Sequence, residues 1–152
     1  MEPKLLPGER IDDLQLNDLH IIQSERGFRF GMDAVILSDF ARVRPREHVV
    51  DMGTGTGILP ILMSAQRSDA SFSAFEIQPD MADMAARSIA LNGLEERICV
   101  YTQDMRRAAQ TIGYGCAHLV TCNPPYGKQG STLKNTSESV TIARHEEETT
   151  ID

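Results

Sequence analysis

Four residues at alternate positions, Asp51, Gly53, Gly55 and Gly57, form a stretch that is well suited to holding a ligand. Glycine permits a sharp turn and lets another molecule approach the backbone closely. Because the stretch lies between an apolar run and a helix-like run, its backbone N–H groups are expected to be free to bind a ligand. The third glycine comes one position too early for the G-x-G-x-x-G turn of dinucleotide-binding proteins. A carboxylate two residues before Gly53 suits a cationic or zwitterionic ligand better than a pyrophosphate.

Two further acidic residues, Glu76 and Asp104, each close a later apolar run. A carboxylate at the position of Glu76 can accept two hydrogen bonds from a ribose diol. Asp104 could accept a hydrogen bond from an adenine amino group. It also suits the N-cap of a helix beginning at Met105, so both roles stay open.

This set of residues resembles the class I S-adenosylmethionine-dependent methyltransferases. The resemblance implies that Asp51 and the glycine turn bind the methionine part of S-adenosyl-L-methionine. It further implies that Glu76 binds the ribose and Asp104 the adenine.

The stretch Asn123-Pro124-Pro125-Tyr126 resembles the motif of amino-methyltransferases, which methylate the amine of adenine, a guanine amine or a glutamine amide. Such a nitrogen is conjugated and planar, so its lone pair is a weak nucleophile. The Asn123 side-chain oxygen and the Pro124 carbonyl oxygen can each accept one N–H hydrogen bond, which directs the lone pair towards the methyl donor. The prolines fix the backbone in advance of the reaction. Tyr126 offers an aromatic face for a base flipped out of its stack.

Alternating apolar and amphipathic runs predict the elements that position these residues. Strands are expected within residues 48–53, 71–77, 97–104 and 118–127, and helices within 57–68 and 78–93, the latter ended by Gly93. The alternation predicts an α/β fold, a Rossmann-like, doubly wound and mostly parallel sheet with its first strand in a central position. All the candidate site residues from Asp51 onward then fall at the carboxyl ends of strands, where such sheets bind ligands.

The part of the chain before the first of these strands is expected to be an N-terminal extension that borders the cofactor pocket. We therefore divide the chain into residues 1–45 and a partial methyltransferase domain at 46–152. Within the extension, 27–33 predicts a short strand or hairpin and 34–43 a helix that is ended by Pro45.

A closer resemblance covers residues 21–146. The segments 21–41 and 120–146 resemble the bacterial tRNA adenine methyltransferases that act beside the anticodon of valine tRNA. That resemblance implies that Phe30 and Asp33 border the cofactor pocket, although Asp33 equally suits a helix N-cap. The same resemblance implies that tRNA is the partner.

Composition sets limits on other partners. The net charge of −7 argues against a large phosphate-binding surface but leaves room for a local basic patch. The sequence contains no signal peptide and no apolar run of about 20 residues, so we expect no membrane association. Three cysteines without metal-ligand spacing are expected to be free, buried thiols in a reducing cytoplasm, and no metal site is expected.

Transfer of a methyl group to the adenine amine of tRNA is the reading that these features favour. The same chemistry on a release-factor glutamine or an rRNA guanine amine remains open, as does a nicotinamide-dependent oxidoreductase or a non-catalytic nucleotide-binding module. Release-factor enzymes usually carry a longer helical domain before the glycine turn, whereas 50 residues precede Asp51 here. The early third glycine and the Asn-Pro-Pro-Tyr stretch argue against the oxidoreductase.

The resembled tRNA enzymes continue past this point with further strands, whereas this chain stops at Asp152. We therefore expect the C-terminal strands of the fold to be missing. The strand at 118–122 would then be an unpaired apolar edge. Reduced stability and weak or absent turnover are expected, with cofactor binding retained.

Overall fold

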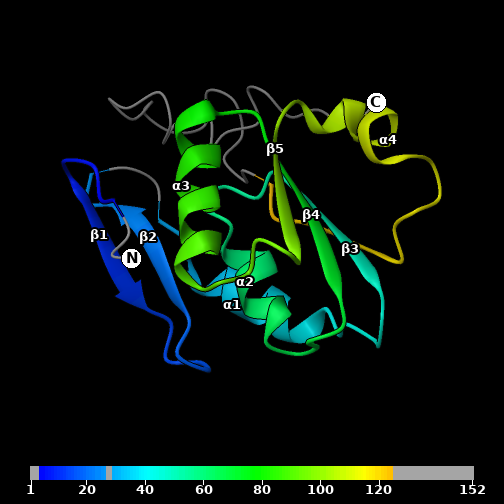
Figure 1. The fold of residues 1–152 in the computed structure, drawn as a ribbon, viewed down its shortest axis with the longest axis horizontal. Helices are drawn as coiled ribbons and strands as arrows, with labels where there is room; N and C mark the ends of the chain where they lie inside the picture. Colours follow the sequence, from blue (N-terminus) through cyan, green and yellow to red (C-terminus); the bar gives the residue numbers. More distant parts are fainter. Residues whose placement is uncertain (1–3, 27–28, 125–152) are drawn as a thin grey trace.

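A parallel four-stranded sheet carries the candidate site residues, and an antiparallel hairpin lies beside it (Figure 1). The computed structural model describes residues 4–26 and 29–124. Its elements are β1 (Glu9–Asp13), β2 (His20–Ser24), α1 (Met32–Phe40), β3 (His48–Met52), α2 (Ile58–Ser64), β4 (Ser71–Glu76), α3 (Pro79–Leu91), β5 (Ile98–Thr102), the 3₁₀ turn η1 (Met105–Arg107), α4 (Ala108–Ile112) and β6 (Leu119–Cys122).

The sheet has the strand order β5-β4-β3-β6, and all its pairs are parallel. This confirms the predicted doubly wound sheet, because the first strand, β3, is central and later strands are added on both sides of it. In this register Asp51 lies opposite Ala74 of β4 and Thr121 of β6. The carboxyl ends of β3, β4 and β6 therefore meet at one edge of the sheet. Within the described residues β6 pairs only with β3, as expected for an edge strand.

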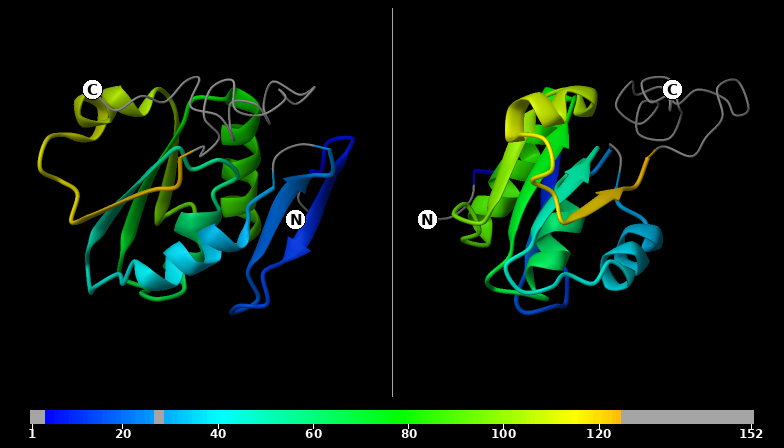
Figure 2. Two further views of the ribbon diagram at one scale, coloured as in Figure 1. Left: turned by 180° about the vertical axis from the view of Figure 1, so that it is seen from behind. Right: turned by 90° about the vertical axis from the view of Figure 1, so that its right-hand side faces the viewer.

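Two apolar clusters cover the two faces of the sheet. The larger joins β3 and β4 to α2 and α3 through fully buried side chains such as Val49, Ile61 and Ile89. The smaller joins Val50 and Phe75 to η1 and α4. Figure 1 and the left view of Figure 2 place α4 and the hairpin at opposite ends of the molecule.

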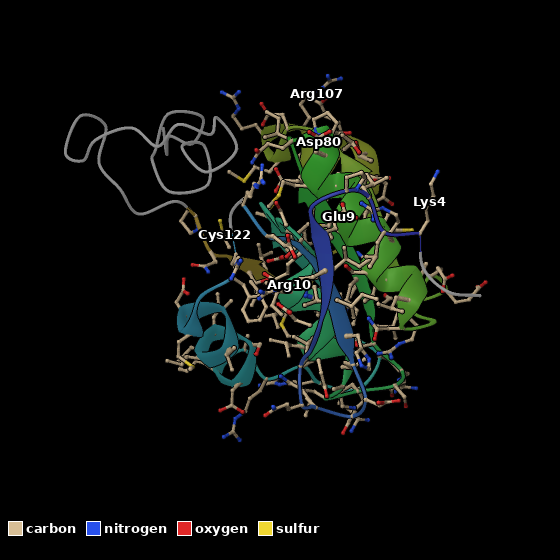
Figure 3. The ribbon with its side chains drawn as sticks, turned by 90° about the vertical axis from the view of Figure 1, so that its left-hand side faces the viewer. Lys4, Glu9, Arg10, Asp80, Arg107 and Cys122 are labelled. Atoms are coloured by element: carbon tan, nitrogen blue, oxygen red, sulfur yellow. The ribbon has the colours of Figure 1, made fainter. Side chains whose placement is uncertain are left out.

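The hairpin β1–β2 is an element that the sequence did not predict as strands. It packs on α3, and Figure 3 shows Glu9 on β1 in front of that helix. The Arg87 guanidinium of α3 donates two hydrogen bonds of 2.7 Å to the Glu9 carboxylate. The Asn92 side chain bridges both backbone groups of His20. Ile21 belongs to the same apolar cluster as the sheet, so this hairpin shares a core with the rest of the described chain. The proposed boundary between residues 45 and 46 stays a prediction.

Two local predictions are wrong. Residues 29–31 form no strand, and the helix that follows begins at Met32, two residues earlier than expected. In the structure the extended backbone of Gly31 serves as the helix N-cap instead of pairing with a neighbouring strand. The cysteines are free as predicted, but the expectation that they are buried is wrong for Cys99 and Cys122, which are exposed on the two outer strands of the sheet that the described residues form.

The helices of the described residues are all too short or too polar to span a bilayer.

Candidate active site at the carboxyl ends of the parallel strands

The glycine turn connects β3 to α2, and all three of its glycines have a positive φ. A Cβ on Gly57 would lie 3.2 Å from the Cβ of Ala85, so this glycine lets α2 pack closely on α3. A Cβ on Gly53 would meet nothing within 4 Å, so the space in front of this glycine is open. The turn therefore combines one packing glycine with one that faces open space.

The expectation that the glycine N–H groups are free is wrong. The N–H of Gly53 donates to the Phe75 carbonyl at 2.9 Å, and that of Gly57 donates to Thr54 at 3.0 Å. The N–H of Gly55 donates to the Glu76 carboxylate at 2.8 Å. The turn thus offers close approach and nearby carboxylates instead of unpaired donors, which favours a cationic ligand over an anionic one.

Glu76 ends β4 and is 5% exposed. Its two carboxylate oxygens accept one backbone hydrogen bond each, from Gly55 at 2.8 Å and from Gln78 at 2.9 Å. A carboxylate oxygen has a second lone pair, so the same group can also accept hydrogen bonds from a ligand diol. Glu76 is held in place by the glycine turn and keeps acceptor capacity.

Asp51 lies under the turn and is 1% exposed. One carboxylate oxygen accepts a hydrogen bond of 2.6 Å from the Thr121 hydroxyl. The other, Oδ2, has no hydrogen-bond partner among the described residues. A buried polar atom without a partner is costly, so the site is better satisfied when a donor is bound there.

Burial raises the pKa of Asp51 to about 6. The Thr121 and Thr54 hydroxyls act in the opposite direction, and the nearby Glu76 carboxylate raises the pKa further. The Thr54 oxygen nevertheless has no hydrogen-bond partner within the described part of the chain, so we assign the direct contact to Thr121. A bound cation would favour the ionised form of Asp51.

Asp104 follows β5 and serves as a cap, one of the two roles left open. Its carboxylate accepts a hydrogen bond from the Arg106 backbone N–H at 2.9 Å and pairs with the Arg106 guanidinium at 2.5 Å. These contacts, the guanidinium first, lower the pKa of Asp104. The backbone bond from Gln103 to the Glu76 carbonyl keeps the end of β5 beside the end of β4.

Asn123 follows β6 directly and is half-buried. Its side-chain amide nitrogen donates a hydrogen bond of 2.8 Å to Oδ2 of Asp33, 90 residues earlier in the chain. Asp33 stands in the first turn of α1, and the N-cap of that helix is Gly31, so the alternative N-cap role of Asp33 is wrong. Pro124 is exposed, and Tyr126 lies outside the described residues.

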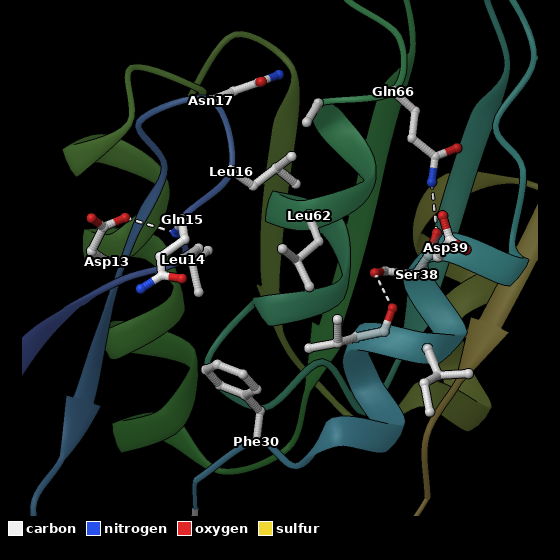
Figure 4. Close-up of a pocket in the computed structure, with 13 residues that line it drawn as sticks. Asp13, Leu14, Gln15, Leu16, Asn17, Phe30, Ser38, Asp39, Leu62 and Gln66 are labelled. Atoms are coloured by element: carbon white, nitrogen blue, oxygen red, sulfur yellow. Dashed lines mark hydrogen bonds between the residues drawn. The ribbon is translucent and has the colours of Figure 1, made fainter.

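Phe30 lies at a groove of about 750 Å³ between the β1–β2 connection and the helices α1 and α2 (Figure 4). The lining is mostly apolar and includes Leu14, Leu16 and Leu62. It contains none of the glycine turn, Glu76, Asp104 or Asn123. The structure therefore does not bring Phe30 together with the other candidate residues, and its contact with a cofactor stays a prediction.

Sequence reasoning missed Thr121, the buried residue that joins β6 to Asp51. Its position was available only from the strand pairing, because Thr121 faces Asp51 across the β3–β6 register. It also missed Arg106 as the partner of Asp104, although a basic residue two positions after a capping acid is a visible local signal.

Curated proteins include relatives of this chain. The chain is 35% identical over 128 residues to a protein of Tolumonas auensis named tRNA1(Val) (adenine(37)-N6)-methyltransferase, covering 83% of this chain and 51% of that protein. A protein of the same name from Haemophilus influenzae is 34% identical over 128 residues, covering 83% and 53%. The chain spans about half the length of these relatives.

Solved structures show the same Rossmann-like fold. P. horikoshii TYW2 in complex with MeSAdo aligns with a TM-score of 0.55 and 24% identity, covering 65% of this chain and 37% of that one. The METTL16 MTase domain aligns with a TM-score of 0.61 and 20% identity, covering 72% and 48%.

A family model assigns the chain to a family directly, because its match covers most of the chain. It spans residues 19–146, from the residue before β2 to beyond Asn123, which follows β6. The chain belongs to the methyltransferase small domain family.

Proposed function

We propose that this chain binds S-adenosyl-L-methionine and directs its methyl group to the N6 amine of an adenine in tRNA. The observation that carries the proposal is the contact between Asp51 and Thr121. Asn123 follows Thr121 by two residues, so its backbone lies only about 7 Å further along the strand. A cofactor seated over Asp51 therefore lies beside the amide of Asn123. The names of the curated relatives supply the adenine and the tRNA.

The residues at this edge of the sheet fit the proposed cofactor. The partnerless Oδ2 of Asp51 matches the ammonium of the methionine part, and the open space at Gly53 admits that part. Glu76 keeps lone pairs for the ribose hydroxyls. We assign Asp104 to the adenine, where it would share its carboxylate with Arg106. Asp33, which contacts Asn123, is assigned to the border of this pocket, and the contact of Phe30 with the cofactor stays a prediction.

When bound, the cofactor supplies an electrophilic methyl group. Asn123 Oδ1 and the Pro124 carbonyl oxygen each accept a hydrogen bond from one N–H of the substrate amine. These two bonds direct the lone pair of the nitrogen out of the ring plane. As the N–C bond formed, the S–C bond of the sulfonium would break to leave a thioether, and the nitrogen would lose one proton to solvent, so no strong general base is required. Tyr126 is assigned to the platform under the base. A tRNA substrate would place the protein in the cytoplasm.

Mass spectrometry of nucleosides tests this function. Bulk tRNA is incubated with the 152-residue chain and methyl-labelled S-adenosyl-L-methionine, and then digested. We expect weak labelling, and we expect it in N6-methyladenosine. Label in a methylated guanosine, or label in a release factor added to a parallel reaction while tRNA stays unlabelled, would reject the proposed substrate. A calorimetric titration that detects no cofactor binding would reject the proposed cofactor.

Gly53→Ala is expected to weaken S-adenosyl-L-methionine binding, because its new methyl group would occupy the open space of the pocket. Gly93→Ala is the matched control, since Gly93 also has a positive φ and open space but lies at the end of α3. Both variants should lose about 1 kcal/mol of stability through the same backbone strain. Calorimetric titration should show weaker binding for Gly53→Ala alone, and equal affinities would contradict the placement of the cofactor.

The affinity for S-adenosyl-L-methionine is expected to depend on pH through Asp51. Its pKa of about 6 means that the cation-binding, ionised form is lost below that pH. Binding should be constant well above pH 6 and weaken about tenfold per pH unit well below it, with proton release on binding near pH 6. In the unliganded chain, the stability of the fold depends on pH in the opposite direction. Protonated Asp51 stabilises the fold fully below pH 3.8, the ordinary pKa of the group, and this stabilisation is lost as the pH rises through about 6.

Calorimetry in buffers of different ionisation enthalpy measures that proton release directly. Asp51→Asn, which cannot titrate, should bind weakly at every pH. A wild-type affinity that stays flat from pH 5 to pH 8 would remove Asp51 from the cation site.

A further inference from the structure

We propose that Asp33 is a positioning residue that fixes the orientation of the Asn123 side-chain amide. The inference deepens the proposed function and rests on it for its catalytic meaning. Asp33 stays at the border of the cofactor pocket, and the inference gives it a direct contact with the proposed catalytic amide and not with the cofactor itself. The observation behind it is the hydrogen bond of 2.8 Å from Asn123 Nδ2 to Asp33 Oδ2.

A side-chain amide has two orientations that exchange its oxygen and its nitrogen. An ionised carboxylate only accepts hydrogen bonds, so it can face the NH₂ group but repels the amide oxygen. Asp33 therefore selects the orientation in which Asn123 Nδ2 points to α1. Oδ1 then points away from α1 and has no donor among the described residues, so it is available to accept the substrate amine.

The charge of Asp33 also strengthens the selected acceptor. A negative charge at the N–H side of an amide polarises the group and increases the electron density on its oxygen. A stronger acceptor at Oδ1 holds the substrate N–H more firmly in the plane of the ring. The lone pair of the nitrogen is then freer to attack the methyl group. The exposed Asp33 carboxylate acts on the reaction only through Asn123.

The beginning of α1 is built to hold this carboxylate. Asp33 lies in the first turn of the helix, where the helix dipole favours a negative charge. Gly31 has an extended backbone that any residue could adopt, with φ at −100° and ψ at 179°. A Cβ at Gly31 would overlap Asp33 Oδ1, so glycine here makes room for the carboxylate and meets no conformational requirement.

Nuclear magnetic resonance of the side-chain amides tests the inference on the full 152-residue chain. Asn123→Ala identifies the two amide proton resonances of Asn123 by their disappearance. In the wild-type chain we expect these two resonances to be widely separated, with the proton facing Asp33 shifted downfield. In Asp33→Ala the separation should collapse towards that of an exposed asparagine.

Two further variants make the comparison specific. Gly31→Ala should reduce the separation, because its methyl group forces the Asp33 carboxylate to rotate away. Asp39→Ala should leave it unchanged, since Asp39 is an exposed acid in the last turn of the same helix. If Asp33→Ala does not fold, the near-isosteric Asp33→Asn replaces it and should reduce the separation without abolishing it. Asn123 resonances that are the same in wild type and in a folded Asp33 variant would overturn the inference.

Kinetics then separate this role from a contact with the cofactor. At saturating cofactor, Asp33→Ala should lower methyl transfer about 10- to 100-fold and should cost nothing further in an Asn123→Ala background. Equal additional losses in both backgrounds, or weaker cofactor binding with an unchanged Asn123 signature, would instead assign Asp33 a direct contact with the cofactor. If the wild-type chain neither binds the cofactor nor transfers a methyl group, the proposed function fails while the amide signature still decides the orientation.

Discussion

Asn123→Ala is expected to lower the rate of methyl transfer at saturating cofactor by about 100- to 1000-fold, the loss seen when one preorganised hydrogen-bonding group of an active site is removed. The variant lacks the Oδ1 acceptor, so one N–H of the substrate amine is left unpaired and the lone pair stays conjugated with the ring. Asn123 has no part in the proposed cofactor seat, which is formed by Asp51, Gly53 and Glu76. The dissociation constant of S-adenosyl-L-methionine should therefore stay within about twofold of wild type. An unchanged dissociation constant is expected when a substitution removes only contacts to the reacting amine.

Single-turnover rates and calorimetric titration on the same preparation separate these two effects. The amide also contacts Asp33 across 90 residues, so its removal could loosen the end of β6. Thermal unfolding of the variant controls for this loss. Wild-type transfer rates in Asn123→Ala, or a loss of activity that follows only the loss of fold, would contradict the assigned role.

Glu76→Ala should have the largest effect on the cofactor. The substitution removes the proposed ribose acceptor and at the same time leaves the N–H groups of Gly55 and Gln78 without their partners. Each unpaired donor costs about 1–3 kcal/mol, so we expect the free energy of unfolding to fall by about 2–6 kcal/mol. The affinity for S-adenosyl-L-methionine should fall by about 100-fold, as expected for two hydrogen bonds to a charged group.

Urea denaturation and calorimetric titration measure the two losses separately. Glu95→Ala is the matched control, because Glu95 is an exposed acid near the end of α3 and its loss changes the net charge equally. Glu76→Gln keeps the shape of the side chain but presents an NH₂ group to one of the two backbone donors. Its affinity should lie between those of wild type and Glu76→Ala. An unchanged affinity in a folded Glu76→Ala variant would remove this residue from the ribose site.

The parallel core of the fold was predictable because its signals are local. Short apolar runs that end in glycine or an acid, followed by amphipathic runs, define β3, α2, β4 and α3 without reference to the rest of the chain. Right-handed crossovers then place β3 in a central position. The same logic brings Asp51, Glu76 and Asn123 to one edge of the sheet.

The hairpin was not predictable because its stability comes from distant partners. The sequence of β1 is mostly charged, and its pairing with α3 depends on Arg87, far along the chain. At the segment around Phe30 the opposite happened, because a strand was predicted where the structure has none. Its alternating aromatic residues are typical of a strand, but with a helix beginning at Met32 the Phe30 side chain packs into the groove instead.

The details of the site depend on register and on long-range contacts. That Thr121 holds Asp51 follows only from how β3 and β6 align. That Asp33 holds Asn123 requires α1 to lie beside the end of β6, which no local pattern indicates. The glycine N–H groups expected to bind a ligand are taken by the Phe75 and Thr54 carbonyls and the Glu76 carboxylate, a competition that residue types alone do not show.

A crystal structure of the chain bound to S-adenosylhomocysteine is the most direct measurement. We predict the ligand amino group at Asp51 Oδ2, the ribose hydroxyls on Glu76, and the sulfur facing Asn123 with room for one planar amine between them. A ligand bound instead in the groove at Phe30, or a sulfur that faces away from Asn123, would contradict transfer of a methyl group between these two places.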